Sequence, residues 1–131
     1  MSQGARSALS RIAPYVPGTS AEDLERQMGI SGAIKLSSNE NPYGAGRLAR
    51  EAVAAAAGEI HIYPDGDSRR LRNALSEHLD IDADHIVVGC GSDELIRLLG
   101  EAYLEPKRPA VFASVTFSQY AFATRLMDAQ E

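Results

Sequence analysis

The stretch His85–Tyr103, HIVVGCGSDELIRLLGEAY, decides the fold of this chain. It begins with an apolar run at 86–88, which is typical of a buried strand, and passes through a turn of small residues at 89–92. Apolar residues then recur at helical spacing from position 95 onward, which predicts a helix. A strand that turns on glycines into a helix leaves backbone N–H groups unpaired at the positive end of the helix dipole. This geometry suits a phosphate group.

Helices and short apolar strands alternate along the rest of the chain, bounded by capping and turn residues. Such alternation predicts an α/β fold with a parallel sheet that helices cover on both faces. Parallel sheets usually hold about four to six strands, and this chain offers fewer convincing ones. We therefore expect the first part of a larger α/β domain, preceded by an irregular arm over residues 1–18. The expected elements are helices over 20–29, 45–57, 68–79, from 91 and from about 117 onward, and strands over 33–36, 86–88 and 110–113.

Composition places the chain among ordinary globular proteins. Its 131 residues are 44% hydrophobic and 24% charged, which is enough for one core. The net charge of −5 argues against a nucleic-acid or anionic-membrane surface. No apolar stretch approaches the ~20 residues of a membrane span, and we expect no signal peptide. The single cysteine fits the reducing cytoplasm, and the histidines share no metal-ligand spacing, so no metal site is expected.

The glycine turn at 89–92 fits several kinds of site. A dinucleotide fingerprint needs a small residue at position 94, where this chain has Glu94. A methyltransferase-type turn usually carries an acidic residue at 87 and a glycine at 93, where this chain has Val87 and Asp93. A third kind is a cup for a single phosphate monoester, in which Asp93 and Glu94 complement the helix dipole when they point away from the anion. A plain helix cap without any ligand is the alternative to all three.

Four turn-rich motifs together resemble histidinol-phosphate aminotransferases, which are pyridoxal-phosphate aminotransferases of fold type I. The motifs occur in the family's order and spacing, and the resemblance covers nearly all of residues 12–131. The combination is fairly specific, because broader aminotransferases share only parts of it. The motifs are Leu36–Pro42 (LSSNENP), Tyr63–Asp67 (YPDGD), Gly89–Glu94 (GCGSDE) and Thr116–Tyr120 (TFSQY).

The resemblance implies pyridoxal 5'-phosphate as the cofactor. Backbone N–H groups of Ser92 and Asp93, next to Gly91, would bind the cofactor phosphate. Phe117 would stack on the pyridine ring, although the proline that commonly precedes the Thr-aromatic pair is replaced by valine here. Tyr63 would reach the cofactor phosphate of the partner subunit in a homodimer. Taken without the resemblance, Phe117 is an ordinary core residue and Tyr63 a turn anchor.

The resemblance also implies the substrate side of the site. Tyr15 would approach the substrate from the N-terminal arm, and Asn39 and Asn41 would lie near the same pocket, although asparagines also serve as turn and cap formers. Residues 1–44 would form the arm and the substrate-side loop, and residues 45–131 the start of a truncated cofactor-binding large domain. The implied reaction moves an amino group between L-histidinol phosphate and 2-oxoglutarate in histidine biosynthesis.

The lysine that forms a Schiff base with the cofactor in this family has no counterpart here. Lys35 and Lys107 both lie outside the Ser-x-x-Lys context that the family uses. We therefore expect no catalytic residue in this chain, and no transamination by the chain alone. Two alternatives stay open: part of a sibling aminotransferase acting on aromatic or other amino acids, and a stand-alone phosphate- or nucleotide-binding α/β module without catalysis.

Overall fold

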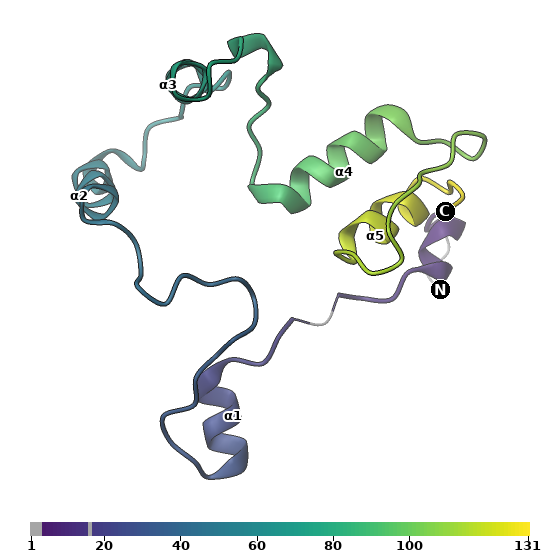
Figure 1. The fold of residues 1–131 in the computed structure, drawn as a ribbon. Coiled ribbons are helices and arrows are strands. Elements are labelled where there is room, and N and C mark those ends of the chain that lie inside the picture. The colour runs from purple at the N-terminus through teal and green to yellow at the C-terminus, as the bar shows by residue number, and fades with distance from the viewer. Residues whose placement is uncertain (1–3, 16) are drawn as a thin grey trace. The chain divides into compact units, whose positions relative to one another are not determined.

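The structure is a computed structural model that describes residues 4–15 and 17–131. Every regular element in these ranges is helical, and none of these helices is both long and apolar enough to cross a membrane. Figure 1 shows the elements along the chain. Pro14–Tyr63 form one compact unit, and Pro64–Glu131 with the described residues before Pro14 form another. The elements are η1 (Ser7–Arg11), α1 (Ala21–Met28), α2 (Arg47–Ala56), η2 (Ala57–Glu59), α3 (Arg69–Leu79), η3 (Ala83–His85), α4 (Gly91–Tyr103) and α5 (Gln119–Leu126).

Helix α1, in the unit Pro14–Tyr63, is bounded by local signals. Ser20 Oγ accepts a hydrogen bond from the N–H of Asp23 at 3.0 Å, which satisfies one of the first free amides of the helix. Gly29 ends the helix in the left-handed conformation with φ of 64°. The helix predicted between Ser20 and Gly29 is confirmed.

Helix α2 confirms the alanine-rich helix predicted over 45–57, but its end differs from the expectation. The α-helix ends at Ala56, and the following Gly58 lies inside the 3-10 turn η2. The backbone of Ala57 stays right-handed helical, with φ of −59° and ψ of −27°. The chain therefore tightens into a 3-10 turn without using the conformational freedom of the glycine.

Helix α3 confirms the helix predicted over 68–79 and is tied to the segment that leads into α4. The guanidinium of Arg72 donates from Nη2 to the C=O of Ala83 at 2.7 Å and to Oδ1 of Asp84 at 3.0 Å. Both acceptors belong to η3, which lies directly before the apolar run 86–88. This contact holds the approach to α4 against α3.

Helices α4 and α5, in the unit that contains Pro64–Glu131, pack against each other. Gly100 is buried, and a Cβ built on it would lie 3.3 Å from Cβ of Ala123. Ala123 and Thr124 of α5 are only 4% and 1% exposed. The hydroxyl of Thr124 donates to the C=O of Tyr120 at 2.8 Å, so its burial leaves no unpaired polar group. Small residues at this contact let the two backbones approach closely.

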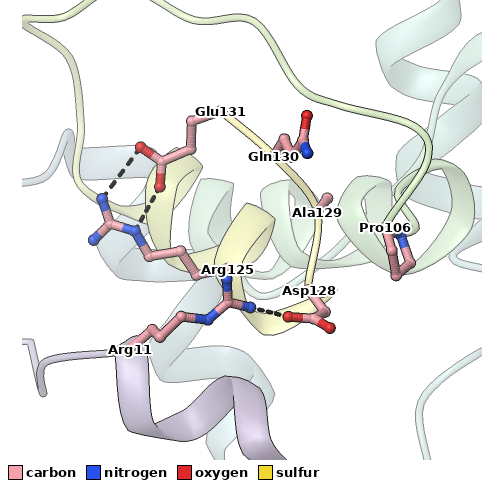
Figure 2. Close-up of a pocket in the computed structure, with 7 residues that line it drawn as sticks. All are labelled: Arg11, Pro106, Arg125, Asp128, Ala129, Gln130 and Glu131. Carbon is pink, nitrogen blue, oxygen red and sulfur yellow. Dashed lines mark hydrogen bonds and ion pairs between the residues drawn. The ribbon is translucent and has the colours of Figure 1, made fainter.

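The beginning of the described chain packs on α5. The 3-10 helix η1 contacts α5, and its Ala8 is only 3% exposed. Figure 2 shows Arg11, the last residue of η1, in an ion pair with Asp128, which follows α5. The prediction of an irregular arm over 1–18 is therefore wrong for Ser7–Arg11, which form a 3-10 helix with a buried Ala8.

Paired strands were predicted at three places, and none forms in the part of the chain that the structure describes. The β-type pairing found there is an isolated bridge between Glu105 and Arg108. A strand needs a neighbouring strand for its backbone N–H and C=O groups, and the described residues supply none. Apolar side chains of these segments consequently face solvent, with Val111 98% and Leu36 95% exposed. The corrected segments are 33–36, 86–88 and 110–113.

Candidate phosphate-binding site

The turn before α4 requires its two glycines for different reasons. Gly91 has a φ of 75°, a left-handed conformation that costs an L side chain roughly 1–2 kcal/mol. Its N–H donates to the C=O of Gly89 at 2.9 Å and closes the turn. A Cβ on Gly89 would lie 3.0 Å from Cδ2 of Leu95 and 3.1 Å from Oε2 of Glu94. Position 91 thus needs conformational freedom, and position 89 needs the absence of a side chain.

The amide groups that follow this turn are open. The N–H groups of Ser92 and Asp93 lie in the first turn of α4, and no hydrogen bond among the described residues engages them. First-turn N–H groups point toward the N-terminus of a helix, where the dipole places partial positive charge. A Cβ on Gly91 would meet no atom within 4 Å, so there is room beside these amides. The geometry fits a single phosphate, which is the smallest of the ligands that the sequence suggested.

A pocket of about 280 Å³ lies beside these amides, between the start of α4 and α5. Sequence reasoning missed the contribution of α5. Gln119 falls inside the motif Thr116–Tyr120, and Phe122 comes three residues later, on the same face of α5. That spacing is the signal by which the two side chains belong together, but only the packing of α5 on α4 shows that they meet the turn. The lining residues are Cys90, Asp93, Glu94, Arg97, Gln119, Phe122 and Ala123.

Phe117 lies in the same unit as the open amides but outside this pocket. It precedes α5, its C=O accepts from the N–H of Tyr120 at 3.2 Å, and the residue is 42% exposed. The aromatic residue that lines the pocket is Phe122. Phe117 therefore lies just before the start of α5 and is not among the residues that line the pocket, and its stacking role stays a prediction.

The remaining predicted site residues lie in the other unit. Tyr15 is 57% and Tyr63 97% exposed, so both hydroxyls are accessible. Asn41 forms a local turn, since its Oδ1 accepts from the N–H of Tyr43 at 3.1 Å. Asn39 adopts a left-handed conformation with φ of 52°, which asparagine tolerates better than most residues. The turn role of Asn41 is observed, whereas the roles of these residues toward a substrate or cofactor stay predictions.

The motif Tyr63–Asp67 contributes a helix cap. The carboxylate of Asp65 accepts from the N–H of Arg69 at 2.9 Å and from the N–H of Asp67 at 3.2 Å. The hydrogen bond from the Arg69 backbone is the main cause that lowers the pKa of Asp65 below its ordinary value, because the ionised carboxylate is the better acceptor. Ser68, directly before α3, makes no side-chain cap of its own, so Asp65 takes that role.

A larger pocket of about 400 Å³ lies where η1 meets the end of α5, and Figure 2 shows its lining residues. Arg11 pairs with Asp128, and Nε of Arg125 lies 2.5 Å from Oε1 of Glu131. Each arginine of this pocket is matched by a carboxylate, so the pocket offers little net charge to an anion. Elsewhere in residues 4–15 and 17–131, no group of three His, Cys, Asp or Glu side chains is arranged to hold a metal ion. The turn before α4 is therefore the better candidate site.

The family model of aminotransferase class I and II matches residues 31–130. The chain belongs to this aminotransferase family. This aminotransferase chain is 43% identical over 125 residues to histidinol-phosphate aminotransferase from Symbiobacterium thermophilum. The alignment covers 95% of the chain and 35% of that relative. It is 39% identical over 128 residues to histidinol-phosphate aminotransferase 2 from Pseudomonas aeruginosa. This alignment covers 96% of the chain and 35% of that relative. The resemblance carried by the four motifs is confirmed.

A solved structure supports the fold as well. The crystal structure of histidinol-phosphate aminotransferase from Sinorhizobium meliloti, in complex with pyridoxal-5'-phosphate, matches this aminotransferase chain with a TM-score of 0.76 at 26% identity. The match covers 98% of this chain and 35% of that chain. It confirms the predicted fold class, part of a fold type I aminotransferase, although the strands are unpaired here. The chain spans about a third of the length of the relatives that it matches.

Proposed function

We propose that this chain is the part of a pyridoxal-phosphate-dependent histidinol-phosphate aminotransferase that holds the phosphate of the cofactor. The observation that carries the proposal is the pair of open amides at Ser92 and Asp93 in a chain of this family. A whole enzyme of this kind would transfer an amino group between L-histidinol phosphate and 2-oxoglutarate in histidine biosynthesis. We expect that enzyme to be a cytoplasmic homodimer.

The residues around the turn fit the cofactor's phosphate. Ser92 and Asp93 would donate their backbone N–H groups to it, and the space beside Gly91 is open among the described residues. When bound, pyridoxal phosphate supplies an electron sink for the charge that develops beside the transferred amino group. This chain's own part is to fix the phosphate end and so orient the ring. Phe117 would cover the ring, and Tyr63 would donate to the phosphate held by the partner subunit.

The unit Pro14–Tyr63 is proposed to serve the substrate. Tyr15 and Asn39 would contact it, and Asn41 would do so in addition to its hydrogen bond to the backbone of Tyr43. In this proposal residues 1–44 are the arm and the substrate-side loop, and the large domain begins at residue 45. The two relatives described above are both named histidinol-phosphate aminotransferases, so we prefer that substrate to the aromatic or other amino acids of sibling enzymes. The same names favour an aminotransferase over a stand-alone binding module.

Neither lysine of the chain is suited to form the Schiff base with the cofactor. Nζ of Lys35 lies 2.5 Å from Oε1 of Glu40 in an ion pair, and an ammonium held by a carboxylate is a poor nucleophile. Lys107 follows the C-terminal end of α4, and a 13-residue helix is about 20 Å long, which separates it from a ligand at Ser92. We propose that the covalent lysine comes from residues beyond these 131, and that this chain alone does not transaminate.

The variant Ser92→Pro tests the phosphate-binding proposal. Proline lacks the N–H and is tolerated near the start of a helix, so this donor is removed without interrupting α4. Hydrogen bonds to charged groups contribute about 1.5–3 kcal/mol, so we expect the affinity for pyridoxal phosphate to fall by roughly tenfold or more. Equilibrium dialysis of the 131-residue chain measures this, with pyridoxal as the ligand that lacks the phosphate.

The matched control is Ala21→Pro, a first-turn proline in α1, which should leave the affinity unchanged. The proposal fails if the parent chain binds pyridoxal and pyridoxal phosphate equally well, or if Ser92→Pro binds pyridoxal phosphate as the parent does. The substrate is tested separately, in a protein that contains the full aminotransferase fold. There, L-histidinol phosphate should be a better amino donor than phenylalanine, and the reverse order would favour a sibling enzyme.

A further inference from the structure

We propose that Glu94 is a positioning residue that clamps the phosphate-binding turn through the backbone of Cys90. Oε2 of Glu94 accepts a hydrogen bond from the N–H of Cys90 at 2.5 Å, across the turn that precedes α4. The inference rests on the proposed function, because the shape of the turn matters for binding only if a phosphate occupies the amides of Ser92 and Asp93. The clamp itself is a property of the chain without any ligand.

The placement of the Glu94 carboxylate also bears on Gly89. A Cβ at position 89 would lie 3.1 Å from the same Oε2 atom of Glu94 and 3.0 Å from Cδ2 of Leu95. The carboxylate therefore packs over the bare Cα of Gly89, which has no positive φ that would otherwise require glycine. The position of the Glu94 carboxylate thus explains why residue 89 is a glycine, which its backbone conformation does not require.

The clamp decides which amides are presented to a ligand. The N–H of Gly91 is bonded within the turn, and the N–H of Cys90 is taken by Glu94. The amides of Ser92 and Asp93 are left open as a pair. This hydrogen bond holds the turn in the binding form before a ligand arrives. Preorganisation of this kind raises affinity by lowering the entropic cost of binding.

A carboxylate beside a phosphate would repel it unless its charge were balanced. Arg97, one helical turn further along α4, supplies that balance, with Nη2 lying 3.5 Å from Oε1 of Glu94. Nη1 of Arg97 also donates to Oε1 of Glu101 at 2.6 Å, which holds the guanidinium along the face of α4. Glu94 therefore acts as a hydrogen-bond acceptor whose charge is shared with Arg97. The amide of glutamine should replace it in the clamp.

Two substitutions separate the acceptor from the charge, and both are measured in the 131-residue chain. Glu94→Gln keeps an oxygen acceptor, whereas Glu94→Ala removes it. Without ligand, the amide proton of Cys90 should exchange faster and move upfield in Glu94→Ala, and stay close to the parent in Glu94→Gln. A net hydrogen bond predicts that Glu94→Ala binds pyridoxal phosphate about 3- to 10-fold more weakly, while Glu94→Gln stays within about twofold of the parent.

The matched control is Glu101→Gln, which alters the other carboxylate partner of Arg97 and should change neither measurement. An unchanged Cys90 amide in Glu94→Ala overturns the clamp, whatever the chain binds. A Cys90 amide that responds while the affinity stays at the parent value overturns the positioning role, as does failure of Glu94→Gln to restore binding. If the parent shows no preference for pyridoxal phosphate over pyridoxal, the proposed function and the positioning role both fail, and the Cys90 amide alone decides whether the clamp exists.

Discussion

Replacing Gly91 by alanine should weaken phosphate binding without abolishing it. The residue has a φ of 75°, and the bound form must keep that conformation to hold the amides of Ser92 and Asp93 together. Without a ligand, alanine at this position relaxes out of the left-handed conformation, and its return on binding costs roughly 1–2 kcal/mol, or about 5- to 30-fold in affinity. Steric overlap adds nothing to this cost, because a Cβ at position 91 would meet no atom within 4 Å.

Equilibrium dialysis with pyridoxal phosphate and with pyridoxal measures the effect. Gly91→Asn should lose less than Gly91→Ala, since asparagine adopts left-handed conformations more readily than alanine. Gly29→Ala is the control, because Gly29 has a φ of 64° at the end of α1 and carries the same kind of strain in the other unit. It should destabilise α1 and leave the affinity unchanged. The reasoning is refuted if Gly91→Ala stays within twofold of the parent, or if asparagine is no better than alanine.

Two further predictions concern stability. Gly100→Val should lower the thermal midpoint of the helical signal. Even a Cβ at position 100 would lie 3.3 Å from Cβ of Ala123, and overpacking of this kind costs about 1–3 kcal/mol. An unchanged midpoint would contradict the close packing of α4 on α5. Asp65 has a lowered pKa, so its capping of α3 is fully present above the unfolded value of about 3.9 and is lost as the pH falls through the lower folded value. The amide signal of Arg69 should therefore titrate below about pH 4 in the parent and stay flat in Asp65→Asn, and parallel titrations would contradict the cap.

The helices were predictable because their boundaries are encoded locally. Ser20 and Gly29 delimit α1 by a hydroxyl cap and a left-handed residue that lie within a few positions of the helix itself. The end of α2 before Gly58 shows what such a local signal leaves open. A glycine permits a left-handed ending but does not require one, and the chain continued into a 3-10 turn.

The strands could not be predicted in the same way. An apolar run such as 86–88 or 110–113 shows that a segment is suited to a sheet, but hydrogen-bond partners decide whether a sheet forms. The described residues do not supply such partners. The likeness to a solved aminotransferase nevertheless confirms that the chain follows the path of that fold.

In the candidate site, too, some features follow from local sequence and others depend on packing. The turn and the open amides at Ser92 and Asp93 follow from local sequence, and the structure shows them as expected from the glycines. The sequence predicted that Glu94 would complement the helix dipole, but its return to the N–H of Cys90 depends on the shape of the turn. Phe122 lines the pocket because α5 packs on α4, and no sequence motif predicts that packing.

The contact between α4 and α5 also has a consequence for the order of folding. Gly100 and Ala123 are 23 positions apart (123 − 100), so little chain must be closed to bring them together. Contacts of short sequence separation form fast, and chains are synthesised from the N-terminus. We expect this helix pair, with the turn at its N-terminal end, to form early in folding. Pyridoxal phosphate that binds at this stage would stabilise a folding intermediate by mass action, and so promote the assembly of its own site.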